Sequence, residues 1–217
     1  MLGCTYWLTS AEVVDALLPD DHPLPVSCCV VVNKGKSNLQ LARLQREGVG
    51  VPQGRIPGLV DWLPPERGRP TVIGPYRPLE DRELGRVRVA GWRRAGEQLT
   101  PLLHSKMAVC CVAHSWDNPI GVWTDYLDPV SVWMGSANWT TASAYHLESG
   151  LWTTDPALLE AAFDYITAVI KISEPADSQA VHPSPEPVQA EWDDAAFAEV
   201  LAEMELDRLA EGLEING

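Results

Sequence analysis

The stretch that most constrains the fold covers residues 103–150. Its first ten residues read Leu-His-Ser-Lys-Met-Ala-Val-Cys-Cys-Val, apolar and β-branched around one polar pair, with no helical stripe. This pattern predicts a buried strand. Because side chains two positions apart in a strand point to the same face, His104 and Lys106 should lie side by side. An imidazole and an ammonium group on an apolar strand need partners, since burying an unpaired polar group is unfavourable.

A phosphate group would satisfy both side chains. Lys106 offers positive charge, and His104 can attack phosphorus or transfer a proton. Further along the chain, Gly135 allows the backbone to approach an anion closely, and Ser136 and Asn138 add neutral hydrogen-bond donors. The structural alternative is a core histidine, a lysine whose ammonium reaches solvent, and an ordinary Gly-Ser-Asn turn.

The order His-x-Lys, then Gly-Ser-x-Asn, then Glu148 resembles the phospholipase D superfamily, also called the HKD proteins, over about residues 86–171. The resemblance implies a phospholipase D-like α/β/α sandwich with a mixed central sheet. It also implies a phosphodiesterase in which one histidine forms a phosphohistidine and a second protonates the leaving oxygen. Water then cleaves the intermediate, and the reaction needs neither a metal ion nor a cofactor.

The resemblance assigns a role to each residue of the motif. The implied catalytic residues are His104, Lys106, Asn138 and Glu148, and the implied phosphate contacts are Lys106, Ser136 and Asn138. Glu148 would hold the His104 ring through its other nitrogen and so fix its tautomer. Members of the family use two motifs per site, whereas this chain has one His-x-Lys, so we expect a homodimer with the site across its two-fold axis.

Two features depart from the family pattern. Cys111 stands where the family usually has an Asp that supports the local structure. The connection between the two motif halves, residues 114–131, is enlarged and rich in Trp and Asp. We expect this insertion to form either a loop at the rim of the active site, where loops usually carry selectivity, or a surface elaboration.

The composition divides the chain into three parts: a phospholipase D-like domain over residues 1–173, a Pro-rich linker over 174–190 and an acidic amphipathic helix over 191–217. The linker segment holds four prolines, and the final segment places apolar residues on one helical stripe with acids opposite. Such a helix usually docks on its own domain, a second subunit or a protein partner. It is not basic, which disfavours a membrane-surface helix.

Within the first domain the pattern predicts alternating strands and helices. Helices are expected from a capping box at Thr9 to Glu12, over residues 36–47 with Gly48 as C-cap, and from Asp155 to about Ser173. Strands are expected over residues 26–33, 49–51, 86–90 and 149–153. The strand over 86–90 alternates and should have one polar face. Residues 52–85 form a long excursion rich in Pro, Gly and Arg.

The net charge of −14 comes mostly from the end of the chain, where residues 175–217 hold eleven acids and one base. In contrast, residues 43–94 hold eleven arginines and six acids. These arginines either follow the phosphates of a nucleic acid or form an ordinary solvated face.

The same sequence bears on the cellular compartment. No run of about 18 apolar residues and no signal-peptide pattern occurs, and the five cysteines do not form a disulfide framework. We therefore expect a cytoplasmic protein with reduced, buried thiols and no membrane association. Zinc ligation by His22 or His114 with the neighbouring cysteines matches no zinc spacing.

Nucleic acid is the substrate that we expect, because small single-motif members of the family resemble bacterial endonucleases. The implied activity is a nuclease that cleaves DNA or RNA. Two alternatives stay open: a phospholipase, and a non-catalytic protein on the same fold that binds nucleic acid or protein.

Overall fold

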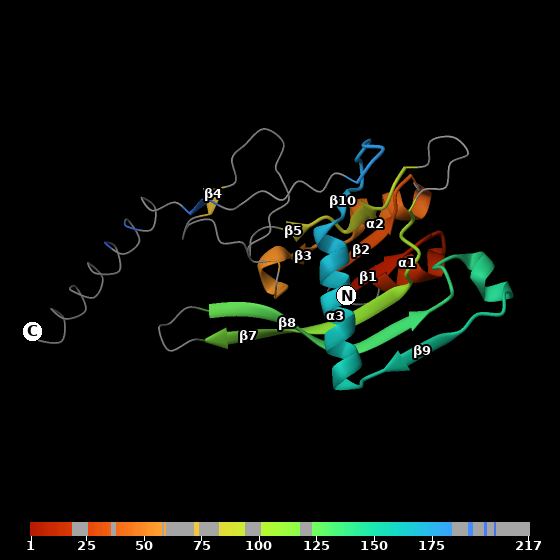
Figure 1. Cartoon of the computed structure of the whole chain (residues 1–217). Helices are drawn as coiled ribbons and strands as arrows, with labels where there is room; N and C mark the ends of the chain where they lie inside the picture. Colours follow the sequence, from red (N-terminus) through yellow and green to blue (C-terminus); the bar gives the residue numbers. More distant parts are fainter. Residues whose placement is uncertain are drawn as a thin grey trace, which may run out of the picture.

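The computed structural model describes residues 1–18, 26–35, 38–57, 59, 72–73, 83–93, 101–117, 123–183, 191–192, 198 and 202. Its centre is a seven-stranded mixed sheet with the order β10-β6-β2-β1-β7-β8-β9 (Figure 1). The strands are β1 (Leu2–Thr5), β2 (Cys29–Asn33), β6 (Val87–Ala90), β7 (Met107–Asp117), β8 (Trp123–Gly135), β9 (Gly150–Thr153) and β10 (Glu174–Pro175). β1, β2 and β6 are parallel, and every other pairing in the sheet is antiparallel.

Helices lie on both faces of the sheet. The helices are α1 (Ala11–Leu17), α2 (Leu39–Glu47) and α3 (Pro156–Lys171). Alternate residues of β2 divide the core, since Val30 and Val32 join a cluster with α1 and α2, whereas Cys29 and Val31 join a cluster with α3. The predicted mixed α/β class with a large mixed sheet is confirmed.

The helix starts follow local capping signals. The side chain of Asn38 accepts hydrogen bonds from the first turn of α2, and Asp155 does the same for α3, which begins with Pro156. Gly48 directly follows α2, as predicted. The cap of α1 is Ser10 rather than Thr9, because the Ser10 hydroxyl accepts from the amide of Val13.

Two small sheets and two 3-10 helices complete the described elements. β3 (Val51–Pro52) pairs with β5 (Glu83–Leu84), and β4 (Val72–Ile73) pairs with β11 (Glu191–Trp192). The 3-10 helices are η1 (Gln53–Arg55) and η3 (Thr141–Tyr145). The strand expected at 49–51 therefore contributes to a small sheet rather than to the central one. Most of the excursion over residues 52–85 lies outside the described residues.

Two strand predictions need correction. The strand expected to contain His104 starts at Met107, because the amide of Leu103 donates to the side chain of Asn33 instead of joining a strand ladder. The polar face expected for residues 86–90 is absent, since Arg88 is only 4% exposed. Its guanidinium donates to the hydroxyl and the carbonyl oxygen of Ser173, which satisfies it inside the protein.

The described part of the Trp-rich insertion is not a loop at the rim of the site. Residues 114–117 continue β7 and residues 123–131 belong to β8, so the two strands form one long hairpin that projects from the sheet (Figure 1). β7 runs for 11 residues away from His104. At about 3.4 Å per residue, β7 is roughly 35 Å long and carries the chain well away from that histidine. The end of β7 at Asp117 and the start of β8 at Trp123 are therefore distant from the predicted site.

The expected linker does not begin at Glu174. Glu174 and Pro175 form β10 on the edge of the sheet, and Glu174 is buried. Glu191 and Trp192 are in β11 rather than in the helix expected over 191–217. Within 193–217 only Ala198 and Ala202 are described, both helical, so the rest of that prediction lies outside the described residues.

The described residues hold five free cysteines, of which Cys4, Cys28 and Cys29 are buried. Burial raises the pKa of Cys4 and Cys29 to about 12 and that of Cys28 to about 11, which keeps these thiols protonated at neutral pH. No described helix has the length and apolar character needed to cross a membrane.

Candidate functional site

The predicted site residues gather at one edge of the sheet, meaning the side on which β7 and β9 begin and β8 ends. β7 is antiparallel to β1 and β8, and β9 is antiparallel to β8, so the start of β7, the end of β8 and the start of β9 share this edge. His104 and Lys106 directly precede β7, Ser136 and Asn138 follow β8, and Glu148 precedes β9. The segments that flank three adjacent strands therefore supply all five predicted side chains.

His104 and Lys106 lie together, as the sequence predicts, although they precede the strand. The Lys106 ammonium lies 3.1 Å from both ring nitrogens of His104 and donates to the His104 carbonyl oxygen at 2.8 Å. The His104 side chain is exposed, whereas Lys106 is 6% exposed. The arrangement presents an accessible imidazole backed by a nearly buried positive charge.

The surroundings of Lys106 have opposing effects on its pKa. Burial lowers the pKa of Lys106, while the nearby Glu148 and Cys4 groups raise it. The larger cause is burial, so the ammonium loses solvation that an incoming anion would replace. A phosphate is a favourable partner for such a group.

Ser136 and Glu148 form a second group of contacting side chains in the predicted site. The Ser136 hydroxyl donates to the Glu148 carboxylate and accepts from the amide of Ser149 at 3.0 Å. The Ser136 amide donates to the Ser149 carbonyl oxygen at 2.9 Å. Gly135 is needed here, because a Cβ on it would lie 2.5 Å from the Ser149 carbonyl oxygen. These contacts fix the end of β8 against the start of β9.

Asn138 is held in place by its neighbour Trp139. The Trp139 amide donates to the carbonyl oxygen of Trp7, and the Trp139 ring packs over Gly3 of β1. The side-chain oxygen of Asn138 is buried and has no hydrogen-bond partner among the described residues. A buried acceptor without a donor is unfavourable, and a phosphodiester, which has only acceptor oxygens, would contact the amide nitrogen of Asn138 rather than this oxygen.

One predicted contact is not formed. The resemblance implies that Glu148 holds the ring of His104, but the described hydrogen bonds link Glu148 to Ser136 and link the His104 ring to Lys106. Glu148 acts on Lys106 through its charge. In this structure the carboxylate therefore contacts Ser136 and acts on Lys106, and it does not hold the His104 ring.

Two residues near the site carry no signal in the sequence. The Tyr6 ring lies 5.5 Å from the His104 ring, measured between centroids, and the Tyr165 hydroxyl shares a hydrogen bond with the Ser105 hydroxyl. Tyr6 directly follows β1, and no sequence pattern marks that strand. Tyr165 belongs to the α3 pattern, which gives no sign of a contact with the segment before β7.

Cys111 replaces the expected Asp without leaving a gap. Its side chain is half-buried against the α3 core cluster, beside a register shift between Cys110 and Cys111. Burial raises the pKa of the Cys111 thiol to about 11, so the group is neutral. The Cys111 side chain therefore contributes apolar packing and no charge at this position.

Four of the described arginines do not form a free phosphate track. Arg43 and Arg46 pair with acids on or beside α2, Arg86 contacts Gly48 and Glu83, and Arg88 is buried. These contacts favour the structural interpretation of the arginine-rich segment for its described part.

The described residues hold no group of three or more His, Cys, Asp or Glu placed to bind a metal ion.

Similarity to known proteins is low. No family model matches the chain, and no curated protein matches it. Among solved structures, the chain is similar to NucT from Helicobacter pylori, with 14% sequence identity, a TM-score of 0.46 and a coverage of 80% of each chain. This level of similarity assigns neither a family nor a function to the chain.

Proposed function

We propose that the chain is a phosphodiesterase of the phospholipase D type that works without a metal ion and cleaves DNA or RNA. The observation that carries the proposal is the contact between the exposed His104 imidazole and the nearly buried Lys106 ammonium. Ser136, Asn138 and Glu148 share the same edge of the sheet, which supports a site for one phosphodiester group.

In the proposed reaction, His104 attacks phosphorus and forms a phosphohistidine while the first alcohol leaves. Lys106 neutralises the phosphoryl oxygens, and Ser136 and the amide group of Asn138 donate hydrogen bonds to them. The hydroxyl of Ser136 donates to Glu148 in this structure, so phosphate binding would redirect this donor. Water then attacks phosphorus and releases His104.

The leaving alcohol needs a proton, and one His104 cannot serve as both nucleophile and acid in the same step. We propose that a second copy of the chain supplies the second histidine across a two-fold axis. Apolar side chains beside the site support this arrangement, because Tyr145 is 85% exposed and Leu147 is fully exposed next to Glu148. Trp7, which contacts the Tyr6 ring, is also exposed.

Leu147 provides a test of the dimer. Leu147→Lys should convert a dimer into a monomer and abolish cleavage, because an ammonium group would replace an apolar contact at the centre of the interface. Sedimentation velocity gives the oligomeric state, and Leu39→Lys is a matched control, since Leu39 is 87% exposed at the start of α2. A wild-type monomer, or an unchanged dimer in Leu147→Lys, would contradict the proposed arrangement.

The function is tested with labelled single- and double-stranded DNA and RNA in excess EDTA. The wild type should cleave at least one of these substrates at a rate that magnesium does not change. Vesicles of phosphatidylcholine and phosphatidylglycerol form the lipid arm. Cleavage of lipid alone would make the protein a phospholipase, and cleavage of no substrate would favour a non-catalytic binding protein.

A further inference from the structure

A cavity that none of the five predicted site residues lines lies next to the His104 site. It has a volume of about 470 Å³, within the range of small-molecule pockets. Its floor is apolar and comes from Val32 of β2 and from Val87 and Val89 of β6. One wall is α2, and the opposite wall is the segment 176–179 that follows β10.

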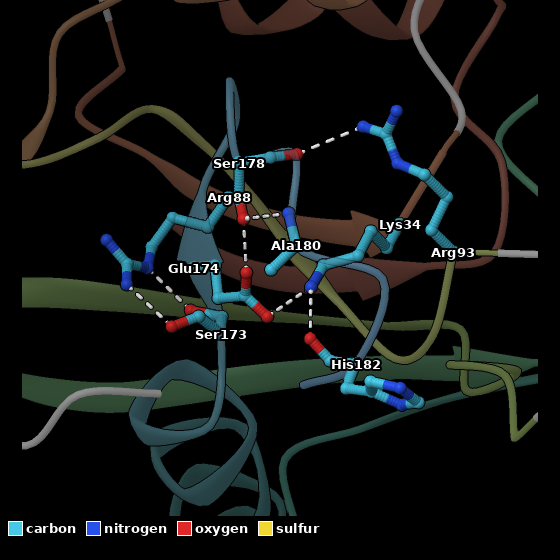
Figure 2. A network of polar contacts seen from close by, with 8 residues as sticks. All are labelled: Lys34, Arg88, Arg93, Ser173, Glu174, Ser178, Ala180 and His182. Carbon is cyan, nitrogen blue, oxygen red and sulfur yellow. Dashed lines mark hydrogen bonds and ion pairs between the residues drawn. The ribbon is translucent and has the colours of Figure 1, made fainter. Parts of the chain in front are cut away.

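The wall segment is held in place by a buried ion pair. Lys34, fully buried at the end of β2, pairs with Glu174 and donates to the carbonyl oxygen of His182 at 3.1 Å (Figure 2). Glu174 also accepts from the Ser178 hydroxyl. The charge of Lys34 is thereby neutralised within the protein. Lys34 therefore holds the wall of the cavity in place and offers no free charge to a ligand.

Arg93 is different, because its charge has no acidic partner in the described part of the chain. It follows β6 and lines the cavity, and its guanidinium donates to the carbonyl oxygen of Ser178 at 3.0 Å (Figure 2). The Nε atom of Arg93 is buried and has no hydrogen-bond partner among the described residues. A buried donor of a charged group is unfavourable without an acceptor, and an anionic oxygen would satisfy it.

We propose that this cavity binds a small organic anion. Its apolar or planar body would lie on the valine floor, and one phosphate or carboxylate group would accept from Arg93. Asp177 also lines the cavity, which favours a ligand with a single anionic group over a polyanion.

The cavity is distinct from the His104 site but shares its edge of the sheet. None of the five residues assigned to the His104 site lines it. The two are adjacent, because the side chain of Asn33, the neighbour of Lys34, accepts from the amide of Leu103 at 3.0 Å. Anion binding in this cavity would not require the proposed phosphodiesterase activity.

Isothermal titration calorimetry on the full chain tests this binding. The probes are AMP for the phosphate arm and indole-3-acetate for the carboxylate arm. Adenosine and inorganic phosphate represent the separate halves of AMP and should bind at least tenfold more weakly. Arg93→Gln should weaken binding of the preferred anion at least tenfold, whereas Arg46→Gln, an exposed arginine on α2 outside the cavity, should leave it unchanged.

Two further variants show whether the anion binds inside the cavity. Ala42→Phe places a ring into the cavity from an exposed position of α2 and should block binding without removing any charge. His104→Ala should bind the anion as the wild type does. Failure of both anions to bind, unchanged binding in Ala42→Phe, or binding lost in His104→Ala but kept in Arg93→Gln would each overturn the inference.

Discussion

Replacing His104 with alanine is expected to abolish cleavage and to leave the fold intact. A loss of about four to six orders of magnitude in kcat is the scale observed when a member of a covalent catalytic unit is removed. His104 is exposed, and its ring contacts Lys106 and Tyr6 only at the surface of the site. The free energy of unfolding should therefore change by no more than about 0.5 kcal/mol, as for other surface substitutions.

The measurement is kcat and KM on the preferred nucleic acid in EDTA, together with urea unfolding of each variant. His114→Ala is the matched control, because His114 is an exposed histidine on the part of β7 that runs away from His104. It should keep the wild-type kcat. A His104→Ala variant with more than a tenth of wild-type kcat would exclude His104 as the nucleophile.

The positions of the motif residues in the site can be predicted from the sequence better than the contacts around them. His104 and Lys106 are two positions apart, so an extended backbone brings them together whether or not the segment pairs as a strand. Gly135 and Ser136 mark the end of β8, and the structure needs a glycine there. The contact expected between Glu148 and His104 rests on the resemblance alone. In the structure the Glu148 carboxylate accepts from the Ser136 hydroxyl instead.

The predictable parts of the fold are those with local signals. Asn38, Gly48 and Asp155 mark helix ends, because caps act within a few residues. β1 lies in the middle of the sheet, but four residues at the start of the chain show no period from which a strand could be predicted. Its position depends on pairing with β2 and β7, which are distant in sequence.

Buried charges are the least predictable feature. Arg88 alternates with valines and resembles an exposed position, yet it contacts Ser173, 85 residues away. Lys34 and Glu174 are separated by 140 residues. No local pattern reveals such pairs, and the prolines that follow Glu174 favour a linker over a buried strand.

The Lys34–Glu174 pair gives the largest stability effect that we expect. Glu174→Ala should lower the free energy of unfolding by about 3–5 kcal/mol, because it leaves the fully buried Lys34 ammonium without its counter-charge. The loss also removes the acceptor of the Ser178 hydroxyl, which fixes the wall of the cavity lined by Arg93. Urea unfolding followed by tryptophan fluorescence measures the change.

A double variant separates the charge from the packing. In Lys34→Met/Glu174→Met, both charges are replaced by apolar side chains of similar length, so most of the lost stability should return. Glu47→Ala is the exposed control, since Glu47 pairs with Arg43 at 43% exposure of its side chain and solvent screens the pair, so its loss should change the free energy of unfolding little. If Glu174→Ala costs no more than this control, the pair does not hold segment 174–182 on the sheet. If it costs several kcal/mol, the folded domain extends to the start of the Pro-rich segment.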